Sequence, residues 1–274
     1  MADLITVLGG TGFIGGNFLR QALALGYDCS APGKGDPGIF QRDLGHVLYS
    51  IGLTADFRTR PLETVEAHVC LLRKLIEIGN FTSLTYISST RLYAGAPSTA
   101  ESATLRVNPN EAGDLYNISK LMGESLCLHC GRGGFKVARL SNIVGLRSDP
   151  DIFIDQLLEA GCRTGHVALR TSLESQKDYL YIDDAVKLLL NITLSEERGI
   201  FNVASGEGIS NREIVRYLER EMGFKVSVAP DAARWDFTAI DVARVHSLFD
   251  FSPQPFSLYF PKFLQAYRQK KGGK

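Results

Sequence analysis

The stretch Leu4-Ile5-Thr6-Val7-Leu8-Gly9-Gly10-Thr11-Gly12-Phe13-Ile14-Gly15 decides the fold of this chain. Its first five residues form an apolar, β-branched run typical of a buried strand, and the residues from Phe13 onward follow helical spacing. The glycines between them permit a tight turn, the close approach of a phosphate and close packing of the helix on the strand. A dinucleotide pyrophosphate would meet the backbone N–H groups of this helix N-terminus. The expected cofactor contacts here are Gly9, Thr11, Gly12, Phe13, Ile14 and Gly15.

Strands and helices alternate along the first half of the chain. Strands are predicted near 27–29 and at 46–51, 84–87 and 136–140, and helices over 61–78 and 114–130. Such alternation predicts an α/β fold with a doubly wound, mainly parallel sheet that is covered on both faces. Ligands of these sheets bind at the carboxyl ends of the strands.

The pattern becomes less regular beyond residue 145. A helix over 152–160 and a strand at 179–182 are predicted, and the pair Ser210 and Glu213 forms a capping box that opens a helix to about residue 222. We therefore expect a Rossmann dinucleotide-binding domain over residues 1–145, with returning segments near 179–203 and 241–250. Residues 146–274 should form mainly a smaller C-terminal substrate-binding lobe.

Composition limits the classes of partner. The chain has 274 residues, 45% of them hydrophobic, and 30 basic residues balance 30 acidic ones without a charge block, so neither nucleic acid nor a membrane is an expected partner. No basic leader and no apolar run of about 20 residues occurs, so we expect a cytoplasmic protein. The five cysteines are scattered, and the lone Cys127-Leu-His-Cys130 lacks a second pair, so no metal site is expected.

The end of the second strand bears on the choice of dinucleotide. An NAD site usually offers a carboxylate there to the adenosine ribose, but Asp28 lies too early in the strand. The strand end is predicted at Pro32-Gly33-Lys34, where the Lys34 ammonium could pair with the 2′-phosphate of NADP, unless it is a solvated loop residue. The sequence thus favours NADP over NAD. The segment from Lys34 to His46 is too short for the usual helix and strand. Further cofactor contacts are expected from Asp43, Ser50 and Gly52.

Tyr116 and Lys120 are four residues apart and therefore share one face of a helix. A tyrosine that exchanges a proton with an alcohol near neutrality needs its pKa lowered from about 10 to about 7, at a cost of roughly 4 kcal/mol. A cation about 4 Å away, in an effective dielectric near 20, supplies a term of that size. Ser88 and Ser89 follow the predicted strand 84–87 and could hydrogen-bond the same substrate oxygen. The alternative is a helix-face Tyr and Lys near loop serines.

These motifs together resemble the extended short-chain dehydrogenases/reductases, the NAD-dependent epimerase/dehydratase type that modifies nucleotide sugars. The resemblance rests on a strand that ends in Ser-Ser, on Tyr93 four residues after the second serine, and on Tyr-x-x-x-Lys followed by Gly123-Glu124. It implies a triad in which Tyr116 is the acid/base, Lys120 lowers the pKa of that tyrosine and binds the nicotinamide ribose, and Ser89 orients the substrate oxygen. It also implies a homodimer formed through the helix that carries Tyr116.

Later segments extend the resemblance and imply substrate contacts. Asn142 lies in a segment similar to the family's RxxNxxG, Lys177 replaces the arginine of an RDY-like segment, and Arg234 matches a second diphosphate contact. The alternative interpretation of Lys177 and Arg234 is that they are surface charges without a role in binding. Thr90-Arg91 stands where 4,6-dehydratases of this family have Asp-Glu, so dehydration is disfavoured. The expected substrate contacts are Ser89, Thr90, Arg91, Asn142, Lys177 and Arg234.

The resemblance implies an NAD(P)-dependent oxidoreductase that acts on a nucleotide diphosphate sugar, as a 4-keto reductase or as a 4-epimerase that retains NAD. The preference for NADP favours the reductase, which consumes its cofactor. Two other classes remain, a non-enzymatic dinucleotide sensor or scaffold and an enzyme for a hydrophobic ketone; the intact triad opposes the first, and Asn142 and Lys177 oppose the second. His68 stands where many relatives carry an active-site asparagine, and it either touches substrate or cofactor or packs within its helix.

Overall fold

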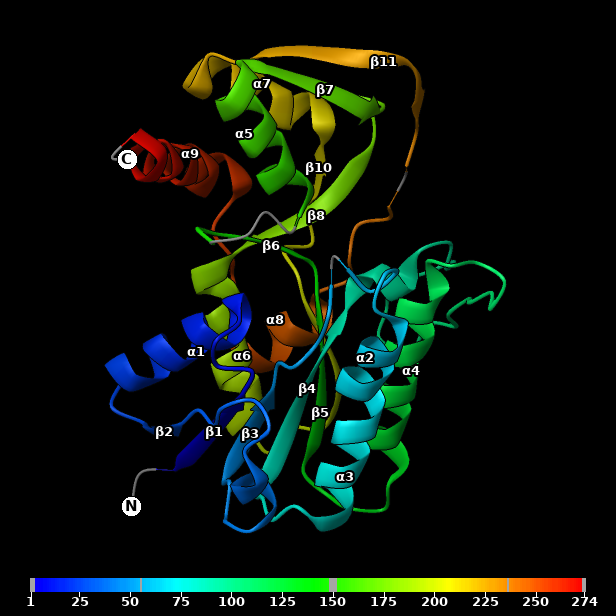
Figure 1. The fold of residues 1–274 in the computed structure, drawn as a ribbon, viewed down its shortest axis with the longest axis vertical. Coiled ribbons are helices and arrows are strands. Elements are labelled where there is room, and N and C mark those ends of the chain that lie inside the picture. Colours follow the sequence, from blue (N-terminus) through cyan, green and yellow to red (C-terminus); the bar gives the residue numbers. More distant parts are fainter. Residues whose placement is uncertain (1–2, 55, 148–151, 236, 273–274) are drawn as a thin grey trace.

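A six-stranded, wholly parallel sheet lies at the centre of the larger half of the molecule (Figure 1). The computed structural model describes residues 3–54, 56–147, 152–235 and 237–272. The parallel register and the crossover helices between the strands confirm the predicted doubly wound fold. In spatial order the strands are β2 (Asp28–Ser30), β1 (Leu4–Leu8), β3 (His46–Tyr49), β4 (Ser83–Ser89), β5 (Phe135–Leu140) and β9 (Gly199–Val203).

Helices cover both faces of this sheet. On one face α1 (Phe13–Ala24) packs against α6 (Ile182–Leu194), and α8 (Ala243–Phe249) lies beside β9. The other face is covered by α4 (Asp114–His129) and by a helical segment of three parts, α2 (Pro61–Val65), η2 (Glu66–Cys70) and α3 (Leu71–Ile78). Figure 1 shows these two layers on either side of β4 and β5.

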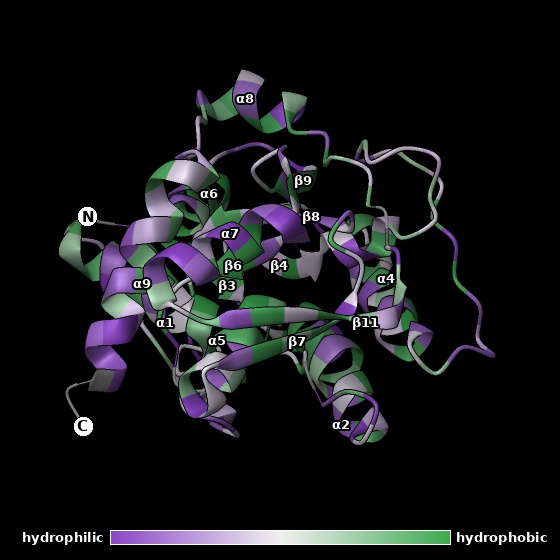
Figure 2. Ribbon diagram, turned by 90° about the horizontal axis from the view of Figure 1, so that it is seen from above, coloured by the Kyte–Doolittle hydropathy of each residue, from purple (hydrophilic) through white to green (hydrophobic). Residues whose placement is uncertain are grey.

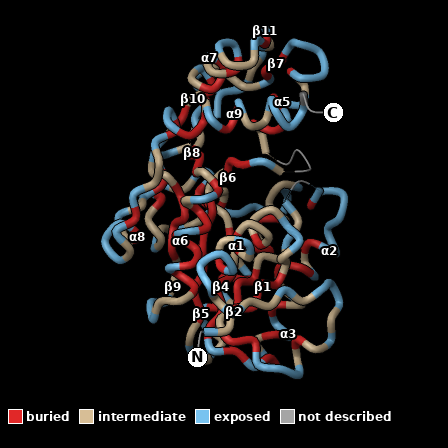
Figure 3. The backbone as a smooth tube through the Cα atoms, turned by 90° about the vertical axis from the view of Figure 1, so that its left-hand side faces the viewer, coloured by how far each residue is buried: buried red, intermediate tan, exposed pale blue. Residues whose placement is uncertain are grey.

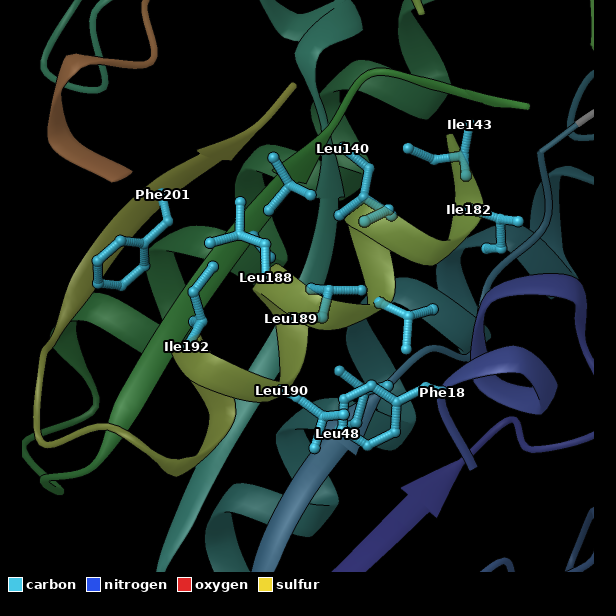
Figure 4. Packing of buried hydrophobic residues seen from close by; sticks show 14 of the residues in the cluster. Phe18, Leu48, Leu140, Ile143, Ile182, Leu188, Leu189, Leu190, Ile192 and Phe201 are labelled. Atoms are coloured by element: carbon cyan, nitrogen blue, oxygen red, sulfur yellow. The ribbon is translucent and has the colours of Figure 1, made fainter. Parts of the chain in front are cut away.

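The apolar residues of the sheet and of α6 form the largest core. Figure 4 shows Phe18 from α1 and Leu48 from β3 packed against Leu189 and Leu190 of α6, all four almost fully buried. The central strands are accordingly hydrophobic and buried, whereas the outer turns of the helices carry hydrophilic, exposed residues (Figures 2 and 3). None of the helices in the described part of the chain is both long and apolar enough to cross a membrane.

A second group of elements lies beyond the carboxyl ends of the sheet and has its own hydrophobic core (Figure 1). Two small sheets, of order β10-β8-β6 and β11-β7, are packed there with three helices. Ser210 accepts a hydrogen bond from the Glu213 N–H, as the predicted capping box requires. The elements are β6 (Asn142–Val144), α5 (Phe153–Thr164), β7 (His166–Thr171), β8 (Gln176–Tyr181), β10 (Gly208–Ser210), α7 (Asn211–Met222), β11 (Lys225–Ala233) and α9 (Phe256–Gly272).

Two local predictions differ from the structure. The helix expected over 61–78 is interrupted by the π turn η2, because hydrophobic spacing does not reveal a local change to i→i+5 bonding. The second strand ends at Ser30 rather than Lys34, since its register with β1 stops at Thr6 and Pro32 lacks an N–H. The short segment before β3 holds only the 3₁₀ turn η1 (Pro37–Phe40), as its length predicts.

A buried ion pair fixes α4 to the sheet. Arg139 of β5 donates to both carboxylate oxygens of Glu124, at 2.9 and 2.6 Å, and each side chain is less than 5% exposed. Glu124 also accepts a hydrogen bond from Ser88 of β4 at 2.6 Å, and Arg139 donates to the Tyr93 hydroxyl at 2.7 Å. Removing one partner of such a pair leaves a buried charge without compensation.

We expect the variant Glu124→Gln to lose about 3–5 kcal/mol of unfolding free energy, because Arg139 would remain charged and buried. Urea denaturation followed by circular dichroism measures the loss. The matched control is Glu77→Gln, which removes an exposed pair with Arg73 and should cost less than about 1 kcal/mol. Equal losses in the two variants would contradict the structural importance of the buried pair.

Candidate active site

The glycine turn after β1 leaves the N-terminus of α1 open to a ligand. Gly9 has a φ of 92° and its carbonyl accepts the Gly12 N–H at 2.9 Å, which forms the tight turn. A Cβ on Gly15 would lie 2.4 Å from the Gly9 carbonyl oxygen, so only glycine lets the helix approach this closely. Gly12 caps α1 without a side-chain hydrogen bond. The first N–H groups of the helix can therefore bind an anion.

A cavity extends from this turn to α4 at the carboxyl ends of the strands. Its volume is about 280 Å³, near the lower end of small-molecule sites. The cavity thus lies where a doubly wound sheet is expected to bind ligands. The polar residues in its lining are Ser50, Thr54, His68, Ser88, Ser89, Tyr116, Lys120, Ser141 and Arg147.

The two serines at the end of β4 have different partners. Ser88 donates to Glu124, as described above, so its hydroxyl is committed to the buried ion pair. The Ser89 Oγ accepts a hydrogen bond from the Arg91 N–H at 3.2 Å, where the 3₁₀ turn η3 (Thr90–Tyr93) begins. Because that contact uses Ser89 as an acceptor, the hydroxyl proton of Ser89 is available to a ligand in the cavity.

Tyr116 and Lys120 lie one turn apart on α4, and both face the cavity. The Lys120 Nζ donates to the Ile87 carbonyl oxygen at 2.8 Å and lies 5.9 Å from the centre of the Tyr116 ring. Burial lowers the pKa of Lys120 to about 7. Gly123 is required on the same helix, because a Cβ there would lie 2.5 Å from the Tyr86 hydroxyl. Close packing of α4 on β4 therefore positions the Tyr-Lys pair.

His68 is fully buried in the π turn and lines the cavity. Its Nδ1 lies 2.8 Å from the Ser119 Oγ, and that hydroxyl donates to the Tyr116 carbonyl oxygen. The Nδ1 must then carry the ring proton, which leaves Nε2 as an acceptor. Burial and the nearby Lys120 lower the pKa of His68 to about 3, so the ring is neutral.

The Nε2 of His68 has no hydrogen-bond partner among the described residues. The position that a Cβ on Gly52 would occupy lies 3.0 Å from this atom and 3.4 Å from the Lys120 Nζ. An acceptor, the His68 Nε2, and a cation, the Lys120 Nζ, therefore both lie beside Gly52. The ring of His68 also meets the Tyr116 ring edge-on at 5.4 Å. His68 is thus placed to contact a ligand, one of the two roles that the sequence left open.

The structure brings half of the predicted site residues together around the cavity. Gly9 and Thr11 belong to the same turn, although they do not line the cavity. The predicted residues that line it are Gly12, Phe13, Ile14, Gly15, Ser50, Gly52, Ser89, Tyr116 and Lys120.

Other predicted residues lie outside the cavity. Lys34 is exposed in the loop after β2. Asp43 precedes β3, at the opposite end of that strand from the edge that carries the glycine turn, and its carboxylate accepts the Gly45 N–H. Thr90 donates to the Leu140 carbonyl oxygen and Asn142 donates to that of Asp178. These four side chains are therefore not part of the cavity lining.

The remaining predicted substrate residues are three cations. Arg91 lies over the Tyr116 ring, with its Cζ 5.7 Å from the ring centre, and is half-buried. Lys177 lies over the Phe153 ring at 5.0 Å, and Arg234 is exposed after β11. None of the three lines the cavity itself.

Arg147 and Ser141 line the cavity but were not predicted. Arg147 forms an ion pair with Asp155 at 3.0 Å and lies over the Phe13 ring at 3.8 Å, which brings the start of α5 against the glycine turn. The only signal in the sequence was the position of Arg147 shortly after the Arg139–Gly145 segment. Across the residues that the structure describes, no group of three His, Cys, Asp or Glu side chains could hold a metal ion.

Comparisons with known proteins agree with this fold. The sequence is 28% identical over 225 residues to "Putative GDP-L-fucose synthase 2" of Oryza sativa subsp. japonica, covering 75% of this chain and 63% of the relative. It is 26% identical over 178 residues to "dTDP-4-dehydro-6-deoxyglucose reductase" of Escherichia coli, covering 61% and 54%. The chain therefore spans less than two thirds of the length of these curated relatives.

Solved structures show the same architecture over nearly the whole chain. RMD from Pseudomonas aeruginosa, complexed with NADPH, matches with a TM-score of 0.76 and 21% identity, covering 97% of each chain. Other solved structures of this fold hold NAD. The sequence model of the NAD dependent epimerase/dehydratase family matches residues 5–204. With its parallel sheet, its glycine turn and this match over most of its length, the chain belongs to the NAD dependent epimerase/dehydratase family.

Proposed function

We propose that this protein is a nucleotide-sugar 4-keto reductase that uses NADPH and the triad Ser89, Tyr116 and Lys120. One observation carries the proposal: the three residues of the triad and residues 12–15, at the start of α1, line the same cavity. A nicotinamide bound there supplies the hydride. An intact triad also argues against a sensor or scaffold, which has no need of a tyrosine beside a buried lysine.

The residues fit a dinucleotide. The glycine turn excludes side chains where a pyrophosphate would approach the N-terminus of α1. The unpartnered His68 Nε2 and the Lys120 Nζ both face the space beside Gly52. We propose that they receive a hydroxyl of the nicotinamide ribose.

The side chains of the triad then transfer one proton to the substrate oxygen. Tyr116 donates its phenolic proton to the oxygen of the 4-keto group as that oxygen gains negative charge. Ser89 donates a hydrogen bond to the same oxygen and orients it. The Lys120 ammonium stabilises the phenolate left behind on Tyr116. Asn142, Lys177 and Arg234 are proposed contacts of the nucleotide diphosphate.

The loop after β2 supports the preference for NADPH. Strand β2 ends at Ser30, and Ala31 follows it. Ala31 lies close to the glycine turn, since its Cβ is 2.9 Å from the position that a Cβ on Gly10 would occupy. No carboxylate is available at this strand end in the described chain, because the nearby Asp36 is bound to the Gly38 N–H and to Arg42. The exposed Lys34 in this loop can meet a 2′-phosphate.

We expect Tyr116→Phe to lower kcat by about 10²–10⁴-fold, because the substrate oxygen loses its proton donor. Steady-state consumption of NADPH with 4-keto nucleotide sugars measures this, and NADPH affinity should stay within about twofold. Tyr267→Phe is the matched control, since Tyr267 packs on Phe263 in α9 away from the cavity. Full activity of Tyr116→Phe would refute the assigned role.

The cofactor preference is tested by Lys34→Asp. We expect NADPH affinity to fall about 10- to 100-fold while NADH affinity is retained, because the new carboxylate repels the 2′-phosphate. Fluorescence titration measures both constants, with Lys225→Asp on β11 as a control. An unchanged NADPH affinity would remove Lys34 from the site. Release of NAD from denatured protein that does not consume NADPH would indicate an epimerase instead.

The pH dependence of reduction should follow Lys120. Burial lowers its pKa to about 7, so the ammonium is lost as the pH rises through that value and the phenolate loses its stabilising charge. We therefore expect kcat to decline from about pH 6 to about pH 9. His68, with a pKa near 3, contributes no step in this range. A kcat that does not change with pH would contradict the role of Lys120.

A further inference from the structure

Two arginines lie together beside the ring of Tyr116. The Arg91 Cζ is 5.7 Å from the centre of that ring and 5.3 Å from the centre of the Phe57 ring, which itself packs on Tyr116. The Arg58 Cζ lies 4.5 Å from the same Phe57 ring. A Cβ on Gly113 would lie 3.1 Å from Nη2 of Arg91 and 3.5 Å from Nη2 of Arg58. Both guanidinium groups therefore flank the start of α4.

Neither arginine forms an ion pair within the described residues. The one hydrogen bond of the Arg91 guanidinium there goes to the Gly113 carbonyl oxygen, at 3.5 Å. The nearby Asp114 attracts Arg91, but its carboxylate is bound to the Asn108 N–H and the Asn117 side chain, at 2.7 and 2.6 Å. By contrast, Arg60, two residues after Arg58, contacts both Asp56 and Glu63.

The local charge is therefore positive, although the Asp114 carboxylate lies in the first turn of α4. Burial lowers the pKa of Arg91, and the neighbouring Arg58 lowers it further. Burial likewise lowers the pKa of Lys177, with a further contribution from Arg91. The N-terminus of α4 adds the positive end of its dipole, since Gly113 offers no capping side chain. An anionic ligand beside Arg91 would relieve its repulsion with Arg58.

We propose that Arg58 and Arg91 bind a carboxylate on the sugar itself, so that the substrate is a nucleotide-linked sugar acid. This inference rests on the proposed function and extends it. The Arg91 Cζ lies 5.7 Å from the centre of the Tyr116 ring, whose hydroxyl is the proposed proton donor, so an anion bound by Arg91 would lie close to the sugar. Two guanidinium groups are suited to the two oxygens of a carboxylate.

The diphosphate is a less fitting occupant of this position. The proposed contacts of the diphosphate, Lys177 on β8 and Arg234 after β11, belong to the second group of elements. Arg58 and Arg91 instead precede α2 and follow β4, in the layer that carries Tyr116. A probe pair that shares one diphosphate and differs only in the sugar carboxylate distinguishes the two sources of negative charge.

The test is isothermal titration of the NADPH-loaded protein with matched pairs. UDP-glucuronic acid is compared with UDP-glucose, GDP-mannuronic acid with GDP-mannose, and dTDP-glucuronic acid with dTDP-glucose. Within the pair whose nucleotide base the protein binds, we expect the sugar acid to bind at least about tenfold more tightly than the neutral sugar. A neutral sugar that binds equally well or better overturns this inference but leaves the reductase proposal intact. If no pair binds, both proposals fail.

Single variants test whether Arg58 and Arg91 cause the tighter binding of the sugar acid. Arg58→Gln should reduce the ratio of acid to neutral affinity about tenfold, and Arg91→Gln should reduce it at least as much. Arg60→Gln, two residues away and already paired, should leave the ratio unchanged. An equal effect of Arg58→Gln and Arg60→Gln would show that the affinity depends on the overall positive charge of this region and not on a contact with the carboxylate. That result would also overturn the inference.

Discussion

The contact of α4 with β4 and β5 is the constraint on which the site depends. Gly123 allows the helix to touch Tyr86, and the buried pair of Glu124 and Arg139 fixes its axial position. Because Ser88 also bonds to Glu124, the next residue of β4 turns its hydroxyl to the opposite side, into the cavity. One packed interface thus sets the relative places of the serine, the tyrosine and the lysine.

Burial also determines the charge states in the site. Lys120 is buried without a carboxylate in contact, so its proton is held loosely, and His68 beside it is kept neutral. These groups differ from the exposed ion pairs of the helices, whose charges are satisfied locally. Of the cations in the cavity lining, Arg147 is paired with Asp155, whereas Lys120 donates to the Ile87 carbonyl oxygen.

The sequence predicted the parts of the protein whose signal is local. The glycine turn, the Tyr-Lys spacing on α4 and the Ser210 cap are each set within a few residues, and the fold follows from the alternation of strands and helices. What the sequence could not show are contacts made in space, such as Arg147 against Phe13 or Arg58 beside Arg91. The end of β2 was likewise not predicted correctly, because the register of a short strand depends on its neighbours.

The π turn between α2 and α3 has a consequence for how the chain tolerates changes in length. One residue more than an α turn requires is accommodated between Glu66 and Cys70. Deleting a single residue there would turn everything downstream by about 100° about the helix axis. Either His68 would leave the cavity wall, or Leu72 and Leu75 would be turned out of the core. Evolutionary insertions and deletions should therefore collect in the loops that flank this helix, and its residue count should stay constant among functional descendants.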